Sequence, residues 1–191
     1  TNTATGNANN RGHDIASDSA DMRLANREAN GHWQVYTTAV TDSPQLAIDV
    51  TEDQEVSMPK QPSFLARASA NNGLNATSTA YTVRYGGHSV LHNIGSHFDA
   101  SDYKFTAPIA GSYFFSANLR VDGFSGGYSY LTLKHYSSTD VLQSDKGRDL
   151  QDGNNSTYLN HIVTAVVNLA VGDYVYMEYI SNGDTSVNLD S

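Results

Sequence analysis

Apolar and polar residues alternate along several stretches of this chain. From Tyr113 to Val121 the odd-numbered positions carry Tyr, Phe, Ala, Leu and Val, and the positions between them are mostly polar. A period of two places one set of side chains on a buried face, which predicts a half-buried β-strand. Pro108 lacks a backbone donor and Gly111 tolerates a positive φ, so these residues predict the turn that leads into the strand.

Further strands are predicted around this one. Leu131 and Leu133 share one face of a strand, with Tyr128, Tyr130 and Thr132 on the other. Gly172-Asp173 predicts a turn before the next apolar alternation. The stretch 157–169 is apolar on both sides toward its end, which is typical of a central sandwich strand. The predicted strands are 63–69, 113–121, 128–136, 157–169, 174–180 and a short polar one at 186–191.

The first 62 residues follow a different pattern. They open on a polar, Asn- and Gly-rich lead-in that is too polar to bury a core. Asn30-Gly31 predicts a tight hairpin that pairs 21–27 with 32–38, and a second hairpin pairs 45–50 with 55–58. A helix over Ser17–Glu28 is the alternative, because Ser can cap it and Ala, Met, Leu and Arg favour it. The apolar residues of Ser17–Glu28 do not follow the spacing of a helix, so strands are favoured.

Two hairpins bury too little apolar surface to fold alone in water. The apolar residues that need cover are Trp33, Val35, Tyr36, Leu46, Ile48, Val50, Val56 and Met58. The same segment of neighbouring chains is the economical source of that cover. Residues 1–62 are therefore interpreted as a β-rich stem and trimerisation segment.

A spaced motif lies in the middle of the chain. It consists of Asn93, Phe98, Phe105, Gly111, Tyr113 and Phe115. This motif resembles the signature of the C1q/TNF-like globular head, and the run from Asn168 to Tyr179 is similar to the penultimate strand of that family. Gly87 and Ala117 stand where the family has further aromatics, and the last strand is polar where the family usually ends on an aromatic and leucines.

The resemblance implies an all-β fold. Residues 63–191 would form an antiparallel jelly-roll sandwich, preceded by the hairpin stem, and the chain would assemble as a homotrimer. A thin β-rich stem joined to such a head also resembles the distal part of a bacteriophage fibre.

Composition narrows the function classes. The chain has eleven basic and twenty acidic residues, and its Lys and Arg residues are not clustered in the sequence. This argues against nucleic acid as a partner. There is no cysteine, no signal peptide and no apolar run long enough to insert into a membrane, and the opening Thr1 suggests a fragment. No nucleophile elbow, phosphate loop or dinucleotide fingerprint is present, so we expect no catalysis.

The stretch from Ser137 to Thr157 is interpreted as the longest polar loop of the head. Its carboxylates, Asp140, Asp145, Asp149 and Asp152, are dense enough to suggest calcium, which takes six to eight oxygen ligands. The spacing does not reproduce an EF-hand, and Lys146 and Arg148 lie between the acids. A solvated recognition loop is the favoured reading, with calcium as the alternative and no other cofactor.

Three histidines lie close together in sequence, at His88, His92 and His97. They could be metal ligands shared at a trimer axis. Without a His-x-His strand pair or a HExxH helix, ordinary loop and strand-edge polar residues are favoured, and no metal site is assigned.

Tyrosines set among Ser, Gly and Asn are typical of adaptable binding surfaces, because the ring gives contact area and the hydroxyl a directed hydrogen bond. Tyr128 and Tyr130 follow such a loop. They either contact a ligand or line the interface between subunits. The predicted ligand-binding set is Tyr128, Tyr130, Asp145, Asp149, Asp152 and Asn154.

Three functions remain open. The leading one is a trimeric fibre protein of a virion, whose head attaches a phage to a host-surface glycan or protein. The second is a non-viral, secreted C1q-like adhesion module, which the absence of a collagen-like stem disfavours. The third is a structural knob without a ligand. Glycosylation sequons occur at Asn75, Asn154 and Asn155, and modification there would weaken the viral reading.

Overall fold

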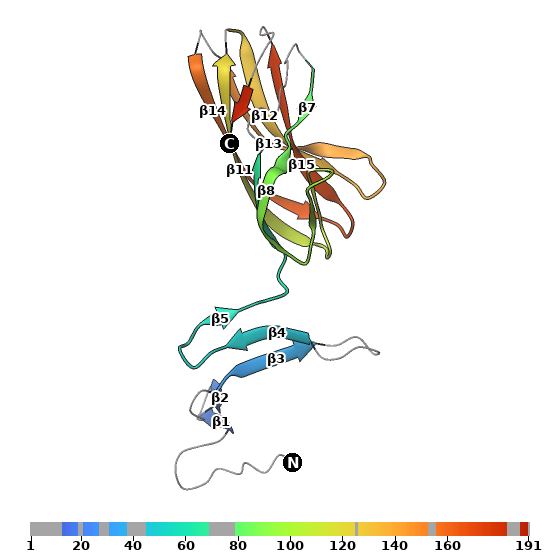
Figure 1. Ribbon diagram of the computed structural model, residues 1–191. Helices are drawn as coiled ribbons and strands as arrows, with labels where there is room; N and C mark the ends of the chain where they lie inside the picture. The colour runs from blue at the N-terminus through green and yellow to red at the C-terminus, as the bar shows by residue number, and fades with distance from the viewer. Residues whose placement is uncertain are drawn as a thin grey trace. The chain divides into compact units, whose positions relative to one another are not determined.

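The regular elements of this protein are β-strands (Figure 1). The computed structural model describes residues 13–18, 21–26, 31–37, 45–68, 79–124, 126–152, 156–182 and 188–190. The chain divides into two compact units, Thr1–Gln61 and Pro62–Ser191. We call the first the N-terminal unit and the second the head. Among the described residues, no helix is long and apolar enough to cross a membrane.

The first hairpin of the N-terminal unit joins β1 (His13–Asp18) to β2 (Asp21–Asn26) in antiparallel register. The strand assignment for 21–26 is therefore confirmed and the helical alternative is wrong. The predicted pairing of 21–27 with 32–38 is also wrong. A partner two residues away leaves little loop to close, so β2 pairs with β1 rather than across Asn30-Gly31.

The second sheet of this unit contains β3 (Trp33–Thr37), β4 (Gln45–Val50) and β5 (Val56–Ser57). Pairing of β4 with β5 confirms the second predicted hairpin. Large apolar side chains on it stay exposed, among them Tyr36 and Val56. Of the eight apolar residues expected to need cover, five are exposed and Leu46, Ile48 and Val50 are half-buried, so the role of this unit as a trimerisation segment stays a prediction.

The head is an antiparallel jelly-roll sandwich, as predicted. Its strands are β6 (Ser63–Ala68), β7 (Tyr81–Thr82), β8 (Tyr85–Ile94), β9 (Phe98–Asp99), β10 (Lys104–Thr106), β11 (Gly111–Phe124), β12 (Tyr128–Tyr136), β13 (Leu142–Asp152), β14 (Ser156–Leu169), β15 (Tyr174–Asn182) and β16 (Asn188–Asp190). One sheet has the order β13-β12-β15-β10-β9, with β7 also paired to β15. The others are β14-β11-β16 and the hairpin β6-β8.

The core lies between these sheets. Its best-buried side chains include Val83, Phe105, Leu119, Val121, Phe124, Leu131, Leu133, Val167 and Tyr179. The alternation predicted for 113–121 is confirmed, since Leu119 and Val121 are buried and the residues between are exposed or half-buried. Tyr113 and Phe115 pack against the core but are only half-buried.

The spaced motif has a direct structural explanation. The side-chain amide of Asn93 donates to the carbonyl of Phe98 (2.8 Å) and accepts from its N–H (3.2 Å), which closes the turn between β8 and β9. The Phe98 ring then stacks on Phe64 (centroids 4.6 Å), and Phe105 contacts Phe64, Tyr113 and Phe115. Both rings point into the core, as predicted.

Two details of the sequence reading are wrong. Gly111 is not among the glycines with a positive φ, and a Cβ there would meet only ordinary contact with Tyr113, so its flexibility is not what makes the turn. In addition, β14 is not a central strand. Among the described strands it pairs only with β11, and Ile162 and Val166 on its outward face are 56% and 68% exposed. Apolar residues on both sides of β14 therefore do not mean burial on both sides.

Candidate functional site

The outward face of the sheet β13-β12-β15-β10-β9 carries several stacked aromatic rings and charged side chains. Core-facing and outward-facing residues alternate along β12: Leu131, Leu133 and His135 are buried, whereas Tyr128 and Tyr130 point outward. Antiparallel pairing sets residues of β13 and β15 beside them on the same face.

Two stacked tyrosines and an arginine form one end of this face. The rings of Tyr128 and Tyr130 are nearly parallel, with centroids 6.1 Å apart and an angle of 8°. The guanidinium carbon of Arg148 lies 4.5 Å from the Tyr130 centroid. Arg148 is held there because it donates to Thr132 Oγ1 (3.2 Å) and to Asp145 Oδ2 (2.6 Å). We call Tyr128, Tyr130 and Arg148 the Tyr–Arg platform.

A charged cluster lies in the middle of the face. Lys134 Nζ is 2.9 Å from Asp145 Oδ1 and 3.1 Å from Glu178 Oε1. Burial works to lower the pKa of Lys134, but hydrogen bonds and charge from Asp145 and Glu178 outweigh it and raise the pKa. Lys134 therefore stays charged, and the cluster links β12 to both neighbouring strands.

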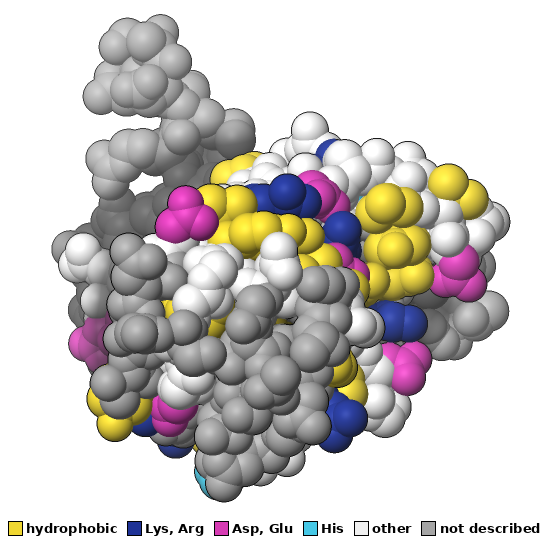
Figure 2. All heavy atoms as spheres, turned by 90° about the horizontal axis from the view of Figure 1, so that it is seen from above, with side chains coloured by type: hydrophobic (Ala, Val, Ile, Leu, Met, Phe, Trp, Pro, Cys, Tyr) yellow, Lys and Arg dark blue, Asp and Glu magenta, His cyan; other side chains and the backbone are white. Residues whose placement is uncertain are grey.

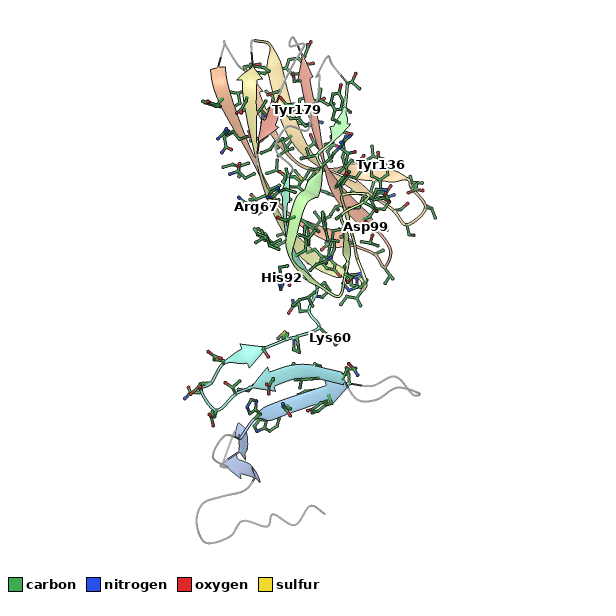
Figure 3. All side chains as sticks on the ribbon, viewed as in Figure 1. Lys60, Arg67, His92, Asp99, Tyr136 and Tyr179 are labelled. Carbon is green, nitrogen blue, oxygen red and sulfur yellow. The ribbon has the colours of Figure 1, made fainter. Side chains whose placement is uncertain are left out.

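A second aromatic group lies on the same sheet at the other end of β12. Tyr136 stacks on Tyr174 (centroids 5.4 Å, 4°) and on Tyr176 (5.7 Å, 25°). Lys104 Nζ sits 4.7 Å from the Tyr174 centroid, and the Tyr174 hydroxyl donates to Asp140 Oδ1 (2.9 Å). Figure 3 labels Tyr136 where the β12–β13 hairpin projects from the head.

Burial and hydrogen bonds raise the pKa values of two hydroxyls in this tyrosine group. Burial, together with the bond to Asp140, raises the pKa of Tyr174 to about 12. Burial and a hydrogen bond with Tyr136 raise the pKa of Tyr176 as well. Both phenols are therefore neutral at physiological pH and remain hydrogen-bond donors. Sequence reasoning missed this group, although the alternating tyrosines at 174 and 176 are a visible signal.

The prediction that Ser137 to Thr157 form a recognition loop is wrong. Residues Leu142–Asp152 form β13, which pairs with β12 along its length, and only the short turn 137–141 lies between them. An edge strand with one neighbour is solvated along its other side, so it accepts a polar sequence that reads like a loop. Asp145, Asp149 and Asp152 thus lie on a strand, and Asn154 lies outside the described residues.

The strand sends its two central carboxylates to opposite faces. Asp145 pairs in register with Lys134 and points outward with it. Asp149 is opposite the buried Leu131 and reaches toward β14, where its carboxylate accepts from the N–H of Ile162 (3.1 Å). They cannot share one ion, and both already have cationic or N–H partners. Within the described residues no group of three His, Asp or Glu side chains gathers as a metal site, and this includes His88, His92 and His97.

Asp149 also belongs to a buried polar array that the sequence analysis did not anticipate. His161 Nε2 is 3.0 Å from Ser129 Oγ, and His161 Nδ1 is 3.3 Å from Asp149 Oδ2. The order Ser-His-Asp resembles that of a hydrolase triad. Ser129 and His161 are both 0% exposed, however, so no substrate can reach the hydroxyl. The array instead ties β12, β13 and β14 together.

The opposite outward surface, on β11 and β14, is chemically different. Phe114 pairs in register with Val166, and they are 71% and 68% exposed. Ile162 and Tyr158 lie on the same face of β14, with Arg120 over the Tyr158 ring (4.9 Å). Figure 2 views the molecule from above rather than onto this face; there hydrophobic side chains are interleaved with Lys, Arg, Asp and Glu.

The C1q domain family model matches residues 64–190, which is the head as the structure delimits it to within two residues. The head is similar to the globular domain of zebrafish complement C1qA, with 23% identity over 68% of this chain and 92% of that chain and a TM-score of 0.43. It is also similar to murine APRIL, with 12% identity over 68% and 97% of the two chains and a TM-score of 0.48. No protein of curated function gives a significant match. The chain belongs to the C1q domain family.

Proposed function

We propose that this protein is an extracellular recognition module that acts as a homotrimer, with the outward face of β13-β12-β15 as its ligand surface. The observation that carries this proposal is the Tyr–Arg platform. Its two rings and its guanidinium are held in place by partners within the sheet before any ligand arrives. A preorganised surface loses little side-chain entropy on binding.

The chemistry of the platform favours a surface glycan, or a polar protein segment, as ligand. Parallel tyrosine rings offer flat apolar area for the ring of a sugar, and Arg148 and the exposed Asp152 beside Tyr128 offer donors and acceptors for its hydroxyls. The attachment of a phage fibre to its host is the specific form of this function that we propose. The uncovered apolar residues of the N-terminal unit support such a fibre stem.

Assembly is proposed to use the β11–β14 surface. Phe114, Val166 and Ile162 are large apolar side chains exposed on one sheet face, which is the type of residue that protein–protein contacts cover. The Tyr–Arg platform lies on the other sheet. Trimer formation would therefore bury one outward face and leave Tyr128 and Tyr130 available, which favours ligand contact over the subunit interface for these two residues.

Binding of the full chain to a glycan array and to candidate host cells tests the ligand surface. Tyr130→Ala and Arg148→Gln should each weaken binding at least tenfold, because the stacking area or the cation over it is lost. Lys146→Gln is the matched control: Lys146 is an exposed cation two residues away on the same strand, so the net charge changes equally.

Equal loss of binding in Arg148→Gln and Lys146→Gln would mean that net charge, not the position of Arg148 over Tyr130, drives attachment. Unchanged binding in Tyr130→Ala and Arg148→Gln would overturn the assigned surface. A wild-type trimer that binds nothing on the array or on cells would favour the ligand-free structural knob.

A further inference from the structure

A cavity of about 500 Å³ opens between β6 and β11 of the head. Its lining includes every residue of two short runs, Phe64–Ala68 and Phe114–Asn118. Successive side chains of a strand point to opposite sides of the sheet. When all residues of both runs line the same space, the strand edges themselves must be its walls. The cavity is thus a slit between the edges of β6 and β11, which belong to separate sheets.

The edge of β11 that faces this slit is unpaired over several residues. On its other edge β11 pairs with β14 along its length, whereas on the slit side β16 covers only Arg120–Asp122. The Tyr85 hydroxyl donates to the carbonyl of Asn118 (2.7 Å), and Tyr85 also lines the slit. The Asn118 carbonyl therefore points into the slit, where a side chain takes the place of a neighbouring strand.

The edge to which the N–H and C=O of Asn118 point determines the edge to which those of every second residue along β11 point. In an antiparallel strand a residue directs its N–H and C=O to the same edge, and every second residue shares that edge. Ser116 and Phe114 therefore also present their backbone groups to the slit. Among the described residues, no strand pairs with them on this side.

The inner side of the slit is apolar. Phe98, Phe105, Leu133 and Met177 of the core lie at its base, and Phe64 and Phe115 flank it. A strand placed in the slit would pair its side chains in register with those of β11. Its residues opposite Phe115 and Ala117 would point into this apolar base, and the residues between would point outward.

We propose that the slit accepts an extended peptide strand of a partner chain, antiparallel to β11 and in line with β16. Apolar residues at alternate positions would fill the inner side, and main-chain hydrogen bonds to β11 would extend the ladder that β16 begins. This is β-strand addition with a partly buried pocket for alternate side chains. Figure 3 labels Arg67 on β6, at the opposite wall.

The observations favour a peptide over a small apolar molecule. A small molecule could fill the apolar base, but it would leave the N–H and C=O groups of Ser116 and Phe114 without partners. Buried unpaired backbone groups are costly, and an extended peptide is the ligand that satisfies a whole strand edge.

The test uses the full chain and a synthetic peptide that alternates Val and Thr, Ac-TVTVTVT-NH₂. Its control has the same composition with the three Val residues adjacent, Ac-TTVVVTT-NH₂. We expect the alternating peptide to bind at least tenfold more tightly and to slow amide hydrogen exchange at Phe114 and Ser116. If the free peptide is weak, fusion after Ser191 through a short Gly-Ser linker raises its effective concentration to the millimolar range.

Ser116→Pro probes the direction of the backbone. It removes an N–H that faces the slit rather than β14, and should abolish peptide binding while Ser116→Ala retains it. Two results would overturn the proposal. One is equal binding of both peptides; the other is binding of a hydrophobic dye alone, with no exchange protection from either peptide, free or fused. The exchange measurement on the wild type keeps the proposal testable even if Ser116→Pro does not fold.

Discussion

The two outward faces of the head are built from the same kind of strand but carry different chemistry. On β11 and β14 the exposed positions include the large apolar side chains Phe114, Val166 and Ile162. On β12, β13 and β15 the outward positions hold tyrosines whose rings are stacked and flanked by cations. Both faces turn away from one shared core.

The difference indicates what each face can bind. An exposed aliphatic and aromatic patch gains free energy mainly by excluding water, so a large and complementary protein surface suits it. Rings with oriented hydroxyls and an adjacent arginine suit a smaller polar ligand that needs directed contacts. One sandwich can therefore assemble through one sheet and recognise a ligand through the other.

The largest expected effect concerns the core that both faces share. Phe105→Ala should lower the free energy of unfolding by about 3–5 kcal/mol, because the ring is 3% exposed and contacts Phe64, Tyr113 and Phe115. Phe114→Ala, at a position that is 71% exposed, should change it by less than about 0.5 kcal/mol in the dissociated chain. Urea unfolding of both variants measures the contrast.

The next effect separates the proposed assembly surface on β11–β14 from the proposed ligand surface on β13-β12-β15. Phe114→Asp should raise the dissociation constant of the proposed trimer at least tenfold, equivalent to about 1.4 kcal/mol, because a carboxylate would be placed in an apolar contact. Leu150→Asp, an exposed leucine (55%) on the platform side of the head, is the control and should leave the trimer intact. Light scattering and native mass spectrometry measure the oligomeric state of both variants. If Phe114→Asp remains a trimer, the subunit interface does not include Phe114.

A smaller, pH-dependent effect concerns the buried His161, beneath the proposed ligand surface. Burial lowers the pKa of His161 below its ordinary value of 6.5, although the charge of Asp149 opposes this. Below pH 6.5 the unfolded chain therefore binds a proton at this histidine that the folded chain does not bind. The free energy of unfolding falls as the pH drops below 6.5, by at most about 1.4 kcal/mol per pH unit. The groups that face His161 are Asp149, Ser129 and Tyr179.

His161→Gln should remove this part of the slope between pH 6.5 and 5, as unfolding curves at several pH values will show. His88→Gln, at an exposed histidine, should keep it. A slope that is unchanged in His161→Gln would mean that other groups control the acid response of the head.

The smallest effect concerns the second aromatic group, formed by Tyr136, Tyr174 and Tyr176. Lys104→Gln removes the cation over Tyr174 and its 3.7 Å pair with Asp102. Both interactions are largely solvated, so the free energy of unfolding should fall by less than about 1 kcal/mol. A larger loss in thermal or urea unfolding would show that this group stabilises the sandwich, and its role in recognition would then need a separate test.

Much of the fold was predictable because its signals are local. Alternation along 113–121 and 128–136 predicts strands with a buried face, and both are strands. The spacing from Asn93 to Phe98 reflects a turn that one side chain closes. The polar sequence of Leu142–Asp152 led to a wrong prediction of a loop. An edge strand, like a loop, is exposed to solvent, so both can have a polar composition.

The residues of the proposed ligand surface could be predicted from the sequence only in part. Tyr128 and Tyr130 were identified from sequence, and their ligand contact remains a prediction. In the sequence Arg148 was noted only as a cation that lies between acidic residues, whereas the structure places it over the Tyr130 ring. The carboxylate of Asp149 was expected to be exposed, but its position opposite Leu131 turns it toward β14.

The amino-acid sequence by itself determined the fold class, the strands of the head with a strong period of two, and the aromatic motif of its core. Those properties depend on which residues lie one, two or five positions apart. Only the tertiary structure decided which strands became neighbours, and hence the stack of Tyr136 on Tyr174, the buried Ser129–His161–Asp149 array and the open slit beside β11. Each of these joins segments far apart along the chain, and their pairing depends on hydrogen-bond register across the whole sandwich rather than on any local pattern.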